Sequence, residues 1–169
     1  MAEEIFTAST ENLRDLKKQR KRICALVNRA IREKQDPDLI SLTKMYALLY
    51  SAYVETSFLK LIHTPKAFTE SEIIQIMAER NLEQKWLKCV DLAFNKLNTT
   101  NLGEVANKKQ TLHRLLQEYI IDPSQIRNKV AHGQWVYCLN NECTKVNHDT
   151  TALMANLDFV KIEKYFCIY

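Results

Sequence analysis

The scarcity of turn-forming residues is the sequence feature that most limits the folds open to this chain. Only two glycines and three prolines occur among its 169 residues. Sandwiches and barrels need many tight turns, for which glycine and proline are the usual residues. With 46% hydrophobic residues, a chain of this length can also bury the core of one domain. We therefore expect a single compact all-α domain over residues 1–169.

The spacing of hydrophobic residues predicts helices along most of the chain. Apolar residues three and four apart indicate an amphipathic helix over 10–35, although Arg20 interrupts its apolar stripe. Further helices are expected over 36–62, 69–79, 82–97, 104–121, 122–132 and 150–165. The expected architecture is a bundle of about five to seven helices.

Several of these helices begin at capping signals. Asp-Pro pairs at 36–37 and 122–123 place a good N-cap residue before a proline that suits the first helical position. Thr69 and Glu72 have the spacing of a capping box. The segment NTTNLG, residues 98–103, has the composition of a turn.

The periodicity changes in the segment that follows the helix over 122–132. The run WVYCLNNECTKV alternates between apolar and polar residues around two asparagines. This alternation predicts one small β-hairpin at about 134–147, with the asparagines in its turn. Such pairing would place Cys138 opposite Cys143.

Cysteine usage indicates a reducing compartment. Five cysteines are an odd number, which suits free thiols better than a secreted disulfide framework. Cys138, Cys143 and His148 are each five residues apart and raise the alternative of a zinc site. However, they offer only three ligands and no C-x-x-C spacing. We expect no metal and no cofactor.

The sequence shows no sign of membrane insertion. The segment MAEEIFTAST lacks the basic and apolar regions of a signal peptide. No uninterrupted apolar run reaches the roughly 18 residues that a membrane-spanning helix needs. We expect a cytoplasmic protein without a membrane partner.

Positive charge is concentrated at the start of the chain. Residues 1–35 contain nine lysines and arginines against five acidic residues, which accounts for the whole net charge of +4. Any attraction for a polyanion should therefore lie on the first predicted helix. The alternative is an ordinary solvated helix face.

The segment SQIRNKVAHGQW, residues 124–135, gathers three chemically versatile side chains in a short predicted helix. Asn128 and His132 are four residues apart and share a face, whereas Arg127 lies about 140° from His132 around the axis. Gly133 is expected in the left-handed conformation that ends a helix. Two such helices across a twofold axis would place two arginines and two histidines around one cleft, an arrangement that suits phosphodiester chemistry.

The R-N-x-x-x-H run, followed by Gly133 in a late short helix of an all-α domain, resembles the signature of the HEPN superfamily. The resemblance covers the architecture of most of the chain, but the sequence itself only at about 126–135, and it assigns no subfamily. It implies a homodimeric, metal-independent RNA endonuclease of a toxin–antitoxin or anti-phage defence system. Cleavage would proceed through attack by the RNA 2′-OH and leave a 2′,3′-cyclic phosphate.

The resemblance also implies roles for individual residues. His132 would be the general acid or base, since imidazole can serve as either near neutral pH. Arg127 would bind the scissile phosphate and stabilise its developing charge, and Asn128 would orient His132 or a phosphate oxygen. Glu55 lies in the most apolar helix, where a carboxylate is costly unless it is paired. An acidic residue at about this place in the family often supports the active arginine, so Glu55 is expected to pair with Arg127. The alternative is an exposed glutamate at the edge of the helix.

Residues beside the motif form the predicted substrate-binding set. Gln134 and Trp135 could contact a base by hydrogen bonding and stacking, and Lys129 completes the set. The alternative for Trp135 is a place in the core. One toxin branch of the family has tyrosine two residues after the histidine, as the target of its antitoxin, but this chain has Gln134 there. The expected partners are an RNA substrate, a second copy of the chain, and an antitoxin or regulatory protein from a neighbouring gene.

Under a second hypothesis, the protein has the same fold but no catalytic activity. A histidine in the last turn of a helix can simply interact with the helix dipole, and an arginine there can be structural. The chain would then be a catalytically inactive HEPN-type helical module that binds a protein partner or a nucleotide.

Overall fold

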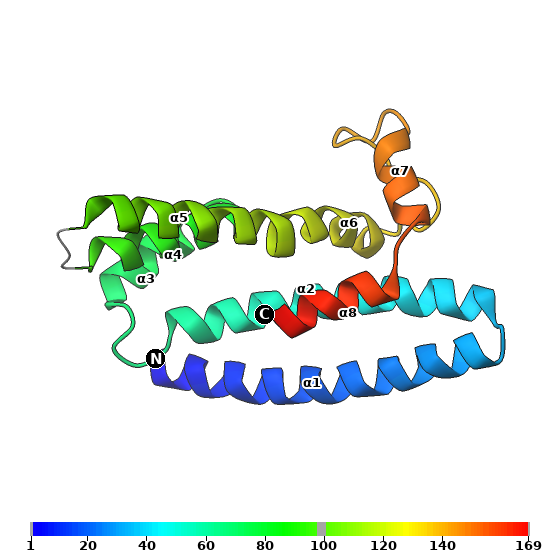
Figure 1. Cartoon of the computed structure of the whole chain (residues 1–169), viewed down its shortest axis with the longest axis horizontal. Coiled ribbons are helices and arrows are strands. Elements are labelled where there is room, and N and C mark those ends of the chain that lie inside the picture. The colour runs from blue at the N-terminus through cyan, green and yellow to red at the C-terminus, as the bar shows by residue number, and fades with distance from the viewer. Residues whose placement is uncertain (1, 98–100, 169) are drawn as a thin grey trace. The chain divides into compact units, whose positions relative to one another are not determined.

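Helices dominate the computed structural model of this protein, which describes residues 2–97 and 101–168 (Figure 1). The described elements are α1 (Ala2–Arg32), α2 (Asp36–Ile62), α3 (Glu70–Met77), α4 (Leu82–Asn95), α5 (Leu102–Leu116), the π-helix η1 (Gln117–Ile121), α6 (Asp122–Ala131), α7 (His148–Ala155) and α8 (Phe159–Ile168). The predicted all-α class is confirmed. None of the described helices has the length and apolar character needed to cross a bilayer.

The chain forms two compact units. The first unit combines Met1–Leu13 with Val54–Asp122, and the second combines Arg14–Tyr53 with Pro123–Tyr169. Helices α1 and α2 each contribute residues to both units. The two units are therefore not successive pieces of sequence, and the single domain over 1–169 stays a prediction.

Helix α1 begins at Ala2, earlier than the predicted residue 10. Glu3 and Glu4 lie in its first turn, where negative charge stabilises a helix N-terminus. The predicted apolar stripe is confirmed, because Val27 and Ala30 are buried. Helix α2 has the predicted bounds, 36–62.

Side-chain caps fix the starts of helices in the first unit. The Thr69 hydroxyl accepts a hydrogen bond from the amide of Glu72 at 3.3 Å, and the Glu72 carboxylate accepts one from the Thr69 amide at 2.8 Å. The predicted capping box is thus confirmed. Asn101 caps α5, which starts at Leu102 instead of the predicted residue 104. Part of the predicted turn at 98–103 lies outside the described residues.

Helix α6 has nearly the predicted bounds, but it does not begin at a conventional N-cap. Asp122 has helical dihedral angles, φ −58° and ψ −46°, and its amide donates to the carbonyl of Gln117, five residues back. The helical run continues because a π-helical turn widens the backbone directly before Pro123, which has no N–H to donate and whose ring crowds the preceding turn.

The predicted β-hairpin at 134–147 is wrong, since no strand forms there among the described residues. Leu139 and Val146 make one isolated antiparallel bridge. Cys138 is buried, whereas Cys143 is exposed and has a positive φ of 54°. The two cysteines are therefore not a cross-strand pair.

The side chain of Asn140 explains why the hairpin does not form. Its Oδ1 accepts hydrogen bonds from the amides of Thr144 at 2.8 Å and Lys145 at 3.2 Å. The amide of Asn140 donates to the carbonyl of Lys145 at 2.9 Å. The Asn140 side chain thus binds the backbone amides of Thr144 and Lys145. In a hairpin with a two-residue turn, these amides would have been available to the opposite strand.

The predicted last helix, 150–165, is two helices. Asn156 ends α7, and the Asp158 carboxylate accepts a hydrogen bond from the amide of Val160 at 2.8 Å at the start of α8. The short polar side chains on either side of Leu157 are the signal for this break.

Each unit has its own buried residues. In the first unit, α4 packs against both α3 and α5. The buried hydrophobic side chains there include Phe58, Ile62, Ile76, Trp86 and Val90. In the second unit, the later part of α1 and the first part of α2 lie side by side, joined at 33–35 (Figure 1). The buried hydrophobic side chains there include Val27, Tyr46, Tyr50, Val130, Cys138, Met154 and Phe166.

Candidate functional site

The R-N-x-x-x-H segment lies at the C-terminal end of α6, where the chain reverses sharply. Gly133 has a φ of 76°, which confirms its predicted left-handed conformation. Its amide donates to the carbonyl of Val130 at 3.1 Å, and the amide of Gln134 donates to that of Lys129 at 2.9 Å. These two bonds form a Schellman motif. His132 is therefore the last residue before the reversal.

Asn128 and His132 present their side chains on one exposed face of this helix end. The amide of His132 donates to the carbonyl of Asn128 at 3.1 Å, so the two residues are one helical turn apart. Both side chains are exposed. A ligand can therefore contact the side-chain amide of Asn128 and the imidazole of His132 at the same time.

Arg127 has a different environment from its two neighbours in the motif. Its guanidinium is partly buried, and Nε donates to the hydroxyl of Ser51 on α2 at 2.7 Å. Burial lowers the pKa of Arg127. An arginine still keeps its proton because its ordinary pKa is very high. The helix end therefore has a fixed positive charge held by α2.

Two of the predicted substrate-binding residues hold the backbone of Leu139. Lys129 Nζ donates to the Leu139 carbonyl at 2.6 Å. The Leu139 amide donates to the side-chain carbonyl of Gln134 at 2.7 Å. Both backbone polar groups of Leu139 are thus bound by side chains from the motif and the residue after Gly133, and these bonds fasten the segment after α6 to the helix end.

Trp135 also contacts its own protein. Its indole N–H donates to the carbonyl of Val130 at 3.0 Å, and its own carbonyl accepts from Lys44 Nζ at 2.6 Å. Its partly buried ring packs against the cluster of Val130, Cys138 and Met154. The ring therefore contributes to the core, and whether it also stacks on a base stays a prediction.

Glu55 is partly buried on α2 and belongs to the first unit. Arg127 belongs to the second unit. The predicted pairing of these two residues stays a prediction.

A polar cluster in the second unit was not among the predicted site residues. Arg20 Nε donates to Glu163 Oε2 at 3.1 Å, and the hydroxyl of Tyr46 also donates to this carboxylate. Arg20 forms an ion pair with Glu163, and its guanidinium carbon lies 4.9 Å from the centre of the Phe166 ring. The sequence signal was the position of Arg20 within an apolar stripe.

The electrostatics of this cluster favour a structural role. Burial opposes ionisation of Glu163, but hydrogen bonds from Arg20 and Tyr46 outweigh it and lower the pKa of that carboxyl. Burial raises the pKa of the Tyr46 phenol and of the Cys24 thiol. Near neutral pH the cluster is thus one ion pair with a neutral phenol and a neutral thiol, and it joins α1, α2 and α8.

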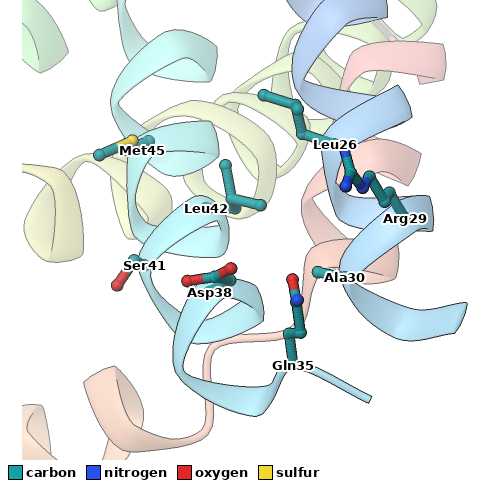
Figure 2. A pocket seen from close by; sticks show the side chains of 8 residues that line it. All are labelled: Leu26, Arg29, Ala30, Gln35, Asp38, Ser41, Leu42 and Met45. Atoms are coloured by element: carbon teal, nitrogen blue, oxygen red, sulfur yellow. The ribbon is translucent and has the colours of Figure 1, made fainter. Parts of the chain in front are cut away.

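A hollow of about 520 Å³ lies between the end of α1 and the start of α2 (Figure 2). Leu26 on α1 points toward Leu42 and Met45 on α2. The polar residues around it are Arg29, Gln35, Asp38 and Ser41. None of the predicted site residues lines this hollow.

Neither a metal centre nor a known relative points to the chemistry of the chain. Among residues 2–97 and 101–168, no group of three or more His, Cys, Asp or Glu side chains is arranged to hold a metal ion. All five cysteines are free thiols. No family model, curated protein or solved structure matches this chain. The end of α6 is therefore the candidate functional site.

Proposed function

We propose that this protein is a metal-independent RNA endonuclease that acts as a homodimer, as an effector of a toxin–antitoxin or anti-phage system. One observation carries the proposal. The end of α6 presents Asn128 and His132 together on an exposed face, and Arg127 in the same helix end is held by Ser51. An exposed imidazole and a fixed positive charge are the groups that RNA transesterification needs.

The proposed reaction uses the substrate's own nucleophile. One imidazole removes the proton of the ribose 2′-OH, and the 2′ oxygen attacks the neighbouring phosphorus. The bond from phosphorus to the 5′ oxygen breaks, and a second imidazole protonates that oxygen. The products are a 2′,3′-cyclic phosphate and a 5′-OH. Two copies of His132, one from each subunit, would divide these roles, and Arg127 would neutralise a non-bridging phosphate oxygen.

The contacts beside the motif favour a second candidate function. Lys129, Gln134 and Trp135 each bind the protein's own backbone. Side chains engaged in this way are less available to a substrate. This observation supports a catalytically inactive helical module that binds a protein partner or a nucleotide.

Cleavage of labelled RNA in excess EDTA separates the two candidates. Wild-type protein should cut a mixed-sequence RNA and leave the matched DNA intact, because DNA has no 2′-OH. His132→Ala should lower the cleavage rate by at least about 100-fold, since it removes a general acid or base. His148→Ala is the matched control, because His148 is an exposed histidine of the same unit outside the motif.

Three further measurements complete the test. Mass spectrometry of the products should find the cyclic phosphate, and sedimentation should find a dimer for both wild type and His132→Ala. Expression should inhibit growth, and His132→Ala should relieve the inhibition. If the wild type leaves every RNA intact, the nuclease proposal fails and the inactive module is favoured. If it cuts RNA as a monomer, the proposed homodimeric mechanism fails.

A further inference from the structure

A row of basic side chains runs along the exposed face of α1 within the second unit. We define the basic stripe as Arg14, Lys17, Lys18, Lys21, Arg22, Arg29 and Arg32. All seven residues are exposed. Asp15 and Glu33 are the acidic residues between positions 14 and 33, and Glu33 forms an ion pair with Arg29 at 2.8 Å.

Helix geometry places the stripe on one side of α1. At about 100° per residue, its seven positions fall within about 140° of the helix circumference. The buried residues Val27 and Ala30 project from the opposite side. At 1.5 Å per residue, the stripe is about 27 Å long, which matches on the order of eight phosphates of one strand of a duplex.

The centre of the stripe is unfavourable for the helix that carries it. Lys17 and Lys21 are four residues apart, as are Lys18 and Arg22, so like charges are neighbours on the helix surface. Among the described residues, no ion pair involves Lys17, Lys18 or Lys21. A bound polyanion would relieve this repulsion.

The composition of the stripe indicates the chemistry of its partner. No aromatic residue occurs between positions 14 and 32, so the stripe has no platform for stacking single bases. Its centre also lacks the large apolar anchor that a protein interface or a membrane-inserted helix would use. Contacts to phosphates need only exposed lysine and arginine.

We infer that the basic stripe of α1 binds the sugar–phosphate backbone of nucleic acid without reading its sequence. In the proposed nuclease, the stripe would hold RNA while the end of α6 acts on it. That part of the inference rests on the proposed function, but binding itself does not require cleavage. The test therefore uses protein that carries His132→Ala, so that the two proposals fail separately.

The experiment measures fluorescence polarisation of a labelled RNA hairpin at several salt concentrations. The triple variant Lys17→Gln, Lys18→Gln, Lys21→Gln neutralises the centre of the stripe. The matched control neutralises three exposed lysines elsewhere in the same unit, at Lys145, Lys161 and Lys164. Both variants change the net charge equally, and thermal melting checks that both are folded.

The stripe variant should lower the slope of log affinity against log salt by about 2 to 3, which weakens binding by on the order of 100-fold at 0.1 M salt. The control should change affinity by less than about threefold, because the three lysines it neutralises lie outside the stripe and salt screens their attraction for the RNA. Asp15→Asn should strengthen binding severalfold. DNA of the same sequence should bind with a similar salt slope.

Three results would overturn the inference. Equal losses in the two triple variants would show only a general charge effect. Binding to phosphatidylserine vesicles or to a polyglutamate peptide without binding to RNA would assign the stripe to a membrane or to an acidic protein. If the His132→Ala protein with an unchanged stripe binds neither RNA nor DNA at 50 mM salt, the stripe is only a solvated helix face.

Discussion

The two compact units of this protein have opposite charge. The first unit contains nine basic and twelve acidic residues, whereas the second contains fifteen basic and eight acidic residues. The modest net charge of the whole chain, +4, therefore conceals a basic half. The exposed residues of the R-N-x-x-x-H motif and the basic stripe both belong to that half, so an average over the sequence understates its attraction for polyanions.

The units also differ in how their helices are held. In the first unit, Thr69, Asn81 and Asn101 cap helices through bonds to residues three positions away. In the second unit, the ion pair of Arg20 with Glu163 joins residues 143 positions apart in sequence. The second unit also has a local cap, at Asn147, and the first unit has an ion pair of Lys96 with Glu72 that joins residues 24 positions apart. The units therefore differ in the sequence span of these ion pairs.

A core substitution in the second unit should have the largest effect on stability. Met154 is 2% exposed and packs with Val130 and Cys138. Met154→Ala removes buried contacts and leaves a cavity, so it should lower the free energy of unfolding by about 3 kcal/mol. The chain has two tryptophans, and each unit contains one, so urea unfolding can be followed separately at Trp135 and, in the first unit, at Trp86.

The transition reported by Trp135 should move further than that reported by Trp86. Ile76→Ala in the core of the first unit is the matched control and should reverse the order. Coincident shifts of the two transitions in both variants would show that the two units unfold together and do not differ in stability.

The two glycines should respond to alanine in opposite directions. Gly133 in the second unit has a φ of 76° and open space around its missing Cβ, so Gly133→Ala should cost about 1 kcal/mol of backbone strain alone. Gly103 in the first unit lies in α5 with its nearest contact at 3.8 Å, so Gly103→Ala should stabilise by about 0.5 kcal/mol. Thermal melting of the two variants checks the signs, and a stabilising Gly133→Ala would contradict the left-handed cap.

The smallest expected effects are two losses of stability on acidification, one for each unit. Burial lowers the pKa of His63 in the first unit below its ordinary 6.5. As the pH falls from 6.5 toward the lower pKa of the folded protein, His63 gains a proton in the unfolded chain before it does so in the folded protein. The free energy of unfolding therefore falls with pH in this range. The pKa of Glu163 is also lowered in the folded protein. A second loss of stability is therefore expected below pH 4.5, its ordinary pKa, as the ionised carboxylate becomes protonated.

Urea midpoints measured from pH 8 to pH 3 should show both losses. His63→Gln should remove the first and Glu163→Gln the second, because each variant has no titrating group at its position. A Glu163→Gln protein with an unchanged acid limb would show that this carboxyl does not contribute to pH stability.

Local signals were sufficient to predict much of the fold. The capping box at Thr69, the bounds of α2 and the left-handed Gly133 depend on residues within one helical turn, and the structure confirms all three. The break between α7 and α8 was also visible in short polar residues around Leu157, but helical periodicity outweighed it.

Other features could not be predicted because they depend on competing or distant contacts. The alternating pattern after Gly133 indicated a hairpin, but the side chain of Asn140 binds the amides that a two-residue turn needed. The position of Arg20 in an apolar stripe indicated a buried partner, although nothing in its neighbourhood identified Glu163. At the candidate site, the motif was visible in sequence, whereas the bonds of Lys129 and Gln134 to Leu139 were not.

The paired bonds to Leu139 have a consequence for any molecule that occupies the end of α6. A ligand that recruits the ammonium of Lys129 or the side-chain amide of Gln134 must take it from the backbone of Leu139. Residues 140–145 would then lose an anchor as the ligand gains one. Occupancy and loosening of this loop would rise together, so faster proteolytic nicking there would report on a filled site.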